Sequence, residues 1–425
     1  MKAILSNKKF TLMMVLMLII SVIFVRSGKY TYLVNSIFFL ILFIFYRTSF
    51  SVHFFRYFFA SICFLLWGIA RGNEIPYMIE DFINFTPLIL LFFHNYDISF
   101  DLNKRMPGYL ANSLLVMIPI SFLIYTYMDY SYGDMVVRFN YDQSTKLALF
   151  SPMYPIIFAP YLLFFFNRLN LTQKCLVHAA LIWLVVFNIL TLTRSHIIGV
   201  LIAYILFFIQ RVIIQNRSYK SIVYIIILLA IVLVGVSLFG SNNNEFFLNN
   251  SIEALEQRNR DAVLNDDITT GRAKEMQEYL NQNLTVLEYL FGRGFGGIKV
   301  DDKSYNPFIG GPEMMHFGPV HAFLKGGIAL VLILYLPLLV SIFKYWRNPN
   351  LSHVAFILLY FLVTNMQTTT WNWSFHVFFY WYALSYLFYP KMRENYIACL
   401  DEEAGETTPE IITEDELDTQ DNTLS

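Results

Sequence analysis

Long apolar runs, separated by short polar segments, fill this chain from residue 10 to residue 389. Since about 20 consecutive apolar residues cross a bilayer as an α-helix, the pattern predicts about twelve transmembrane helices. The first run has no small-x-small cleavage site after it, so we interpret it as a retained helix rather than a signal peptide. The twelve runs lie near residues 10–25, 30–46, 50–70, 76–94, 107–128, 148–166, 175–193, 196–213, 221–239, 318–343, 352–369 and 373–389.

One long polar stretch, residues 240–316, interrupts this alternation. Two segments in it have helical spacing, and threonines before the second can cap it. We therefore predict a large, partly helical loop between residues 1–239, which hold helices 1–9, and residues 317–390, which hold helices 10–12. Residues 391–425 form a tail with ten acids between Asp401 and Asp421. Such a segment is expected to be disordered.

The composition places the chain in the same class, an all-α polytopic membrane protein. Hydrophobic residues make up 56% of it and charged residues 14%, whereas about a quarter of the residues of soluble domains are charged. The three cysteines form neither a disulfide framework nor a metal-ligand spacing. Nothing in the composition points to a nucleic-acid partner.

Lysines and arginines in the short connections predict the orientation, because cytoplasmic loops carry more of them than outer loops do. With the N-terminus inside, every cytoplasmic connection contains lysine or arginine. The count predicts both termini in the cytoplasm and the 240–316 loop on the outer side. The basic residues on the cytoplasmic side are Lys2, Lys8, Lys9, Arg47, Arg56, Lys104, Arg105, Arg168, Lys174, Arg211, Arg217, Lys220, Lys344, Arg347, Lys391 and Arg393.

Three arginines lie on the predicted outer side, in three separate connections: Arg138, Arg194 and Arg272. Taken singly, each fits a solvated surface charge. Arg194, between two apolar runs with almost no loop, also fits an interfacial anchor. Together the three suggest an anionic ligand held by planar, bidentate guanidinium groups.

His316 precedes the tenth predicted helix, and His321 and Lys325 follow within it, four residues apart on one helical face. In one interpretation Lys325 reaches back to the membrane surface and both histidines are ordinary interface residues. In the other, a histidine at the water-exposed boundary accepts a proton from a hydroxyl near neutral pH.

Glu80 and Asp81 lie one turn inside the fourth predicted helix, where ionisable groups are costly and tend to be functional. An acid at the start of a helix, at the interface, is an equal alternative. Arg293 lies in the glycine-rich segment 290–297, which we interpret as a turn, because no strand precedes it as a dinucleotide-binding loop would require. The acid pairs at 266–267 and 301–302 have no further ligands nearby, so no metal site is predicted.

His316 and Gly327, eleven residues apart, resemble a signature of the O-antigen polymerase and O-antigen ligase superfamily of bacterial envelope enzymes. Phe317 stands where that family usually has an amide or hydroxyl residue, and Leu330 where it has a small one. Because the stricter form of the signature belongs to ligases, these departures favour a polymerase.

Three other pieces resemble the same family in the same order, and the resemblance is clearest over residues 135–345. Residues 191–195, Thr-Leu-Thr-Arg-Ser, are similar to its Thr-x-Ser-Arg-small stretch. Gly271 and Arg272 are similar to the Gly-Arg pair that opens its large periplasmic loop, and residues 290–297 to its glycine-rich turn. Arg138 lies where the family has an arginine in an earlier outer loop.

The resemblance implies a GT-C-like fold and a metal-independent, inverting glycosyltransferase without cofactors. Its donor would be a glycan on undecaprenyl pyrophosphate, transferred at the outer face of the bacterial inner membrane to an acceptor sugar hydroxyl. The family's activity makes the product an O-antigen or capsular polysaccharide. Membrane lipid and a chain-length regulator protein are the other implied partners.

The resemblance also assigns roles to residues. Arg194 and Arg272 would bind pyrophosphate and stabilise its growing negative charge, with support from Arg138. His316 would orient or deprotonate the acceptor. The remaining residues expected to contact the substrate are Arg293, His321, Lys325 and Glu80.

Two alternatives stay open. A ligase would attach finished glycan to a lipid or protein acceptor instead of joining repeat units. A lipid-linked-oligosaccharide flippase or another transporter also fits twelve helices with both termini inside, a common carrier layout. Against a carrier, the long loop lies outside, and the two halves of the chain show no repeat.

Overall fold

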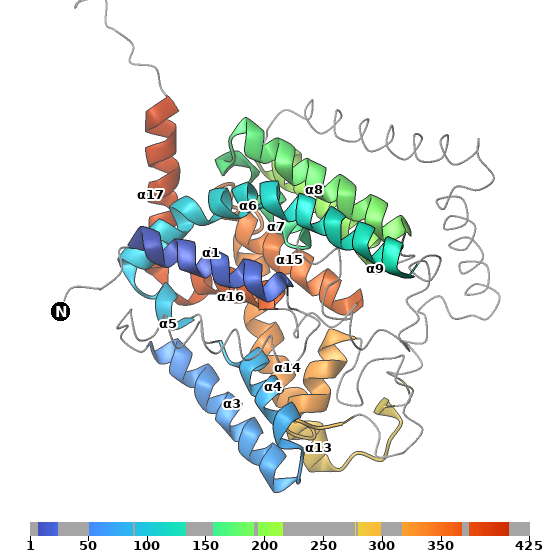
Figure 1. Ribbon diagram of the computed structural model, residues 1–425. Coiled ribbons are helices and arrows are strands. Elements are labelled where there is room, and N and C mark those ends of the chain that lie inside the picture. The colour runs from blue at the N-terminus through green and yellow to red at the C-terminus, as the bar shows by residue number, and fades with distance from the viewer. Residues whose placement is uncertain are drawn as a thin grey trace, which may run out of the picture.

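The computed structural model describes residues 7–23, 51–87, 90–132, 156–190, 194–215, 277, 279–298, 317–367 and 374–407. Within these ranges all regular secondary structure is helical (Figure 1), as the apolar runs predict. In chain order the helices are α1 (Asn7–Ile23), α3 (Val52–Ala70), α4 (Ile75–Phe85), α5 (Leu90–Phe93), α6 (Tyr96–Tyr132), α7 (Ala159–Leu162), η5 (Leu163–Arg168), α8 (Leu171–Leu190), α9 (Arg194–Phe208), η6 (Ile209–Ile214), α13 (Val286–Phe291), α14 (Gly318–Tyr345), α15 (Ser352–Gln367), α16 (Ser374–Phe388) and α17 (Pro390–Thr407).

Four helical stretches of the described chain are long and apolar enough to cross a membrane: Val52–Ala70, Ile75–Phe93, Tyr96–Ile124 and Gly318–Tyr345. Shorter apolar helices lie at Leu171–Val186, Ile198–Ile214 and Ser352–Met366. The runs predicted at 30–46 and 221–239 fall outside the described residues. The described residues are therefore all-helical and fit a helical membrane protein, while the number twelve and the GT-C-like arrangement stay predictions.

Buried tyrosines of α16 connect the helices around it. α16 packs against α1, α5, α14, α15 and α17. Tyr382 and Tyr386 both donate to Oδ1 of Asn103 on α6, at 2.8 and 2.9 Å, and Tyr380 donates to the carbonyl of Leu334 on α14 at 2.6 Å. The rings of these three tyrosines fill the apolar interior, and each of their hydroxyl groups has a hydrogen-bond partner.

α3 and α4 form a helical hairpin at one edge of the bundle (Figure 1). Ser51 caps the start of α3 by accepting a hydrogen bond from the Phe54 N–H at 3.0 Å. A proline, Pro76, lies in the first turn of α4, where its missing N–H costs nothing. The buried residues of α4 follow helical spacing and form one face: Met78, Asp81, Asn84 and Phe85.

α14 is interrupted near its start at Gly327, whose φ of 60° and ψ of −159° are not helical. That conformation is available almost only to glycine. The interruption brings the first turns of α14 against residues 290–292. A Cβ added at Gly327 would lie 2.4 Å from the carbonyl carbon of Leu290 and 2.6 Å from the nitrogen of Gly292. Gly327 therefore permits both the kink and the close approach.

The predicted disorder of residues 391–425 is wrong for its first part. Residues 390–407 form α17, and Met392, Tyr396 and Cys399 are buried. These positions repeat at helical spacing and pack against α6, where Asn395 donates to Ser99 Oγ at 2.5 Å. The acidic composition of the segment indicates disorder, although a few apolar residues form one narrow face of a helix. Residues 408–425 lie outside the described chain.

Gly327→Ala should lower the thermal unfolding midpoint and the yield of folded protein. The backbone strain alone is on the order of 1–3 kcal/mol, and the new methyl group collides with the Leu290 carbonyl. Gly199→Ala in α9 is the matched control, because its Cβ would lie at an ordinary 3.6 Å from the Tyr360 hydroxyl. Thermal unfolding of the two detergent-purified variants measures their midpoints. Equal midpoints for the two variants would contradict the role given to Gly327.

Candidate functional site

The glycine-rich turn, residues 292–297, is the centre of the candidate site. It follows α13, which Thr285 and Glu288 start with a capping box. Gly292, Gly294 and Gly296 all have positive φ, so the alternating glycines fold the segment back on itself. At Gly294 the turn meets α3 so closely that a Cβ would lie 2.5 Å from the Gly68 nitrogen. The prediction of a turn here is therefore confirmed.

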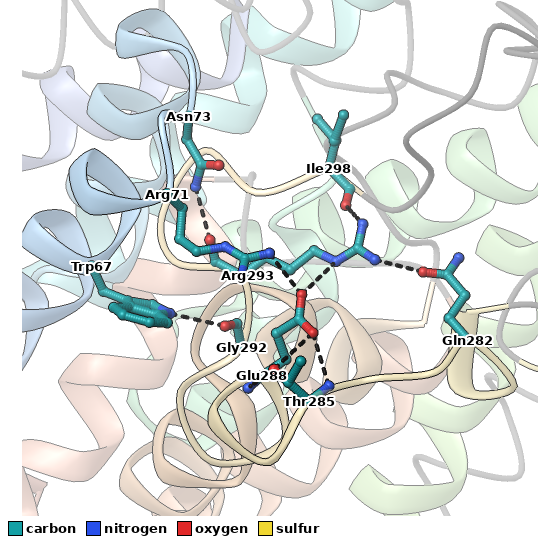
Figure 2. A network of polar contacts seen from close by, with 9 residues as sticks. All are labelled: Trp67, Arg71, Asn73, Gln282, Thr285, Glu288, Gly292, Arg293 and Ile298. Atoms are coloured by element: carbon teal, nitrogen blue, oxygen red, sulfur yellow. Dashed lines mark hydrogen bonds and ion pairs between the residues drawn. The ribbon is translucent and has the colours of Figure 1, made fainter.

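The α3–α4 hairpin binds the carbonyl groups of this turn. Trp67 Nε1 donates to the Gly292 carbonyl at 3.0 Å. Asn73 Nδ2 donates to the carbonyls of Arg293 and Phe295, both at 2.8 Å. Figure 2 shows Trp67 and Asn73 reaching the turn from the same side. The hairpin thus supplies hydrogen-bond donors to three carbonyl groups of the turn, those of Gly292, Arg293 and Phe295.

α14 binds the turn from the other side. The Arg293 N–H donates to the Leu324 carbonyl at 2.8 Å, three residues before the kink at Gly327. Lys325 Nζ donates to the Gly297 carbonyl at 2.9 Å. Lys325 also forms a buried ion pair of 2.8 Å with Asp81 of α4, and Asp81 accepts the Gly296 N–H at 2.6 Å.

His321 lies one helical turn before Lys325 and is also buried, with 1% exposure. Its ring stacks on Phe85 of α4 at 6.0 Å between centroids, and Phe85 stacks on Phe295 of the turn at 5.7 Å. The histidine, the α4 phenylalanine and the tip of the turn therefore form one aromatic stack. This stack makes His321 part of the packing between α4, the turn and α14.

A second charged cluster, here called the outer cluster, joins the turn to α13 and to the α3–α4 hairpin (Figure 2). Glu288 pairs with Arg71 at 2.7 Å and lies 3.8 Å from Arg293 Nε. Arg293 also donates to the Ile298 carbonyl at 2.7 Å and to Gln282 Oε1 at 2.6 Å. Arg293 is 9% exposed, while the Arg71 side chain is 37% exposed. Two guanidinium groups and one carboxylate leave this cluster with a net positive charge.

The pKa of the Glu288 carboxyl is lowered from its ordinary 4.5. Burial acts to raise it, but hydrogen bonds from Thr285 and the charges of Arg71 and Arg293 outweigh burial. Nearby, burial raises the pKa of Tyr279 to about 12, so its phenol stays protonated at neutral pH. Neither group is suited to act as a general base near neutrality.

The structure brings together three of the predicted site residues and leaves others undescribed. Arg293, His321 and Lys325 all belong to the contact between the turn and α14. Lys325 is fully buried, so the alternative that it reaches the membrane surface is wrong. Glu80 is half-buried on α4, next to Asp81. Arg138, Arg272 and His316 lie outside the described residues, and Arg194 begins α9 without a described side chain.

α15 connects two of the sequence motifs. Gly199, five residues after Arg194, packs against Tyr360 and Thr364 of α15. Gly318, two residues after His316, packs so closely on Asn365 of the same helix that a Cβ would collide with its amide. The chain segments that carry Arg194 and His316 therefore lead to neighbouring residues at one end of α15.

Two charged residues of the site, Glu288 and Arg71, are not among those that the sequence predicts, and Asp81 is predicted only as the neighbour of Glu80 in a candidate acid pair. Asp81 lies three residues after Met78 and four before Phe85 on α4, so the helical phase of apolar positions marks it, rather than Glu80, as inward-facing. Thr285 and Glu288 have the spacing of a capping box, which also marks the start of α13. Nothing in the sequence pairs Arg71 with Glu288.

Among the described residues, no group of three or more His, Cys, Asp or Glu side chains could hold a metal ion. The charged groups present can bind an anion, orient a polar ligand or position the turn. No protein-family model, curated protein or solved structure matches the chain.

Glu288→Gln should lower the thermal midpoint at pH 7 while keeping the capping box, since glutamine also serves at that position. The folded-state pKa of Glu288 lies below 4.5. Its charge therefore stabilises the fold above that pH, and the stabilisation is lost as the pH falls through the folded-state pKa. The difference between wild type and variant should shrink below pH 4.5.

Thermal unfolding from pH 7 to pH 3.5 measures this difference. The control is Glu402→Gln, which removes an exposed ion pair of 2.6 Å with Lys104. Exposed pairs contribute little, so this control should change the midpoint slightly at either pH. A Glu288→Gln difference that grows on acidification would contradict the assignment.

Proposed function

We propose that this protein is a polysaccharide repeat-unit polymerase of the O-antigen or capsular type. It transfers glycan from undecaprenyl pyrophosphate to an acceptor sugar at the outer face of the bacterial inner membrane. In this proposal both termini are cytoplasmic and the 240–316 loop is periplasmic. The reaction is inverting and metal-independent.

The observation that carries the proposal is the contact between two of the segments that resemble the O-antigen polymerase family. The glycine-rich turn packs on the start of α14, where Gly327 follows His316 by eleven residues. The Arg293 N–H bonds to Leu324, and Gly292 lies against Gly327. The two short patterns, at residues 290–297 and 316–327, thus meet at Gly292 and Gly327, as parts of a single site would.

The chemistry follows from the charge that develops on the leaving group. The acceptor hydroxyl oxygen attacks the anomeric carbon while the bond from that carbon to the pyrophosphate oxygen breaks. The bonding electrons go to the pyrophosphate, and guanidinium groups of Arg194 and Arg272, with Arg138 in support, stabilise this charge. His316 takes the hydroxyl proton. The apolar helices hold the polyprenyl chain, and the loop covers the sugars.

Transport of a lipid-linked oligosaccharide is the second candidate. One observation favours it: Asp81 and Lys325 form an ion pair buried between two apolar helices. Charged pairs in such surroundings mark ion and substrate pathways in many carriers. A carrier would move its substrate without breaking a glycosidic bond.

An assay on the purified protein separates these functions. The protein in detergent receives a synthetic polyprenyl-pyrophosphate repeat unit with a chelator present, and the products are resolved by size. A ladder spaced by one repeat unit is expected for a polymerase. One transfer to an added lipid acceptor, without a ladder, would indicate a ligase. Movement of the donor across liposomes without any product would indicate a transporter.

Arg194→Ala and Arg272→Ala should each reduce polymer formation by about 10²–10³-fold, the usual loss when one donor to a developing charge is removed. His316→Ala should reduce it by about 10²–10⁴-fold if the imidazole is the base. Arg347→Ala is the control, since this exposed arginine follows the far end of α14. Wild-type rates in any of the first three variants would remove the role given to that residue.

A further inference from the structure

Asp81 and Lys325 are two charged side chains buried between apolar helices. Asp81 on α4 is 4% exposed and Lys325 on α14 is 0% exposed. Taking both ions out of water is costly, and well-packed apolar replacements for such a pair are often as stable or more stable. Stability alone therefore does not account for the pair.

The remaining contacts of the pair go to the glycine-rich turn. Asp81 Oδ2 accepts the Gly296 N–H at 2.6 Å, and Lys325 Nζ donates to the Gly297 carbonyl at 2.9 Å. With the ion pair of 2.8 Å, these bonds close a ring through α4, the turn and α14. Each partner of the pair thus holds one end of the same two-residue segment.

This ring has a direction. The Gly296 N–H needs an acceptor on α4, and the Gly297 carbonyl needs a donor on α14. A carboxylate at 81 and an ammonium at 325 meet both needs. With the two charges exchanged, a donor would face the N–H and an acceptor would face the carbonyl. The attraction between the two charges would be the same in either arrangement.

We propose that Asp81 and Lys325 are positioning residues that fix the glycine-rich turn between α4 and α14. They do so through the polarity of their hydrogen bonds rather than through their mutual attraction. Arg293 and the kinked start of α14 are held in place with the turn, because the Arg293 N–H bonds to Leu324. The inference concerns the position of the turn and holds whichever reaction the protein catalyses.

Two double variants separate polarity from attraction. Asp81→Lys with Lys325→Asp keeps an ion pair but reverses both hydrogen bonds to the turn. Asp81→Asn with Lys325→Gln removes both charges but keeps an acceptor on α4 and a donor on α14. The surface exchange Lys104→Glu with Glu402→Lys is the control, because that ion pair does not touch the turn.

Hydrogen exchange measured by mass spectrometry on the detergent-purified protein reports the turn directly. A peptide covering residues 292–298 contains the bonded N–H groups of Arg293, Phe295, Gly296 and Gly297. A peptide covering residues 328–343 of α14 reports whether the protein is folded. The two readings together distinguish a released turn from an unfolded chain.

The charge-exchanged variant should exchange roughly ten- to hundredfold faster in the turn, the factor expected when a hydrogen bond to a charged group is lost. Its α14 peptide should stay protected. The uncharged variant and the surface control should protect both peptides as the wild type does.

Three results would overturn the proposal. Wild-type protection of the turn in the charge-exchanged variant would show that the attraction between the two charges is sufficient to fix the turn. Fast exchange of the turn in a folded uncharged variant would show that the charges themselves are required. If neither double variant accumulates as folded protein, the pair supports the whole fold and not the turn in particular.

Discussion

A buried, irregular backbone segment has to find its hydrogen-bond partners inside the protein, because no water reaches it. The glycine-rich turn is such a segment, and its partners come from α3, α4 and α14. A helical membrane protein tolerates non-helical backbone only where protein or a water-filled cavity surrounds it. The arrangement of these three helices therefore follows from the polar groups of a few turn residues. The kink at Gly327 belongs to the same constraint, since it lies where α14 meets Leu290 and Gly292 and three residues after Leu324, which accepts the Arg293 N–H.

The ion pair and the charged cluster at the turn differ in burial and in net charge. The pair of Asp81 and Lys325 is buried and balanced, and removal of one partner from such a pair typically costs about 3–5 kcal/mol. The cluster of Glu288 with Arg71 and Arg293 reaches the surface only at Arg71 and carries excess positive charge. The buried pair thus determines geometry, while the outer cluster gives the site a charge that favours anions.

Much of the architecture was predictable, because length and apolarity of a run decide whether it forms a membrane helix. α1, α3, α8, α15 and α16 begin and end within a few residues of the predicted runs. α17 is not predicted, because its three buried apolar residues are a small minority in an acidic segment. The turn at residues 292–297 was also predictable, since alternating glycines exclude regular helix and strand.

The partners of that turn were not predictable. Helical phase was sufficient to choose Asp81 over Glu80 as the inward-facing acid, but no local pattern pairs α4 with a lysine on α14. Such pairings depend on which helices are neighbours in space, and the hydropathy of the sequence does not predict helix neighbours. Likewise, the sequence places Arg194 and His316 in one site only through the resemblance of their segments to one enzyme family. The connection of their segments through Thr364 and Asn365 becomes visible only in the packing of α15.

The long separation between the hairpin and the turn also has a consequence for biogenesis. Gly296 follows Asp81 by 215 residues, and ribosomes add about 5–20 residues per second. The α3–α4 hairpin therefore spends roughly 10–45 s in the membrane before its backbone partner is synthesised. During this interval Trp67, Asn73 and Asp81 present polar groups that the finished fold conceals. The nascent chain needs water, lipid headgroups or an insertion factor to satisfy them, so assembly of this protein depends on when its middle section arrives.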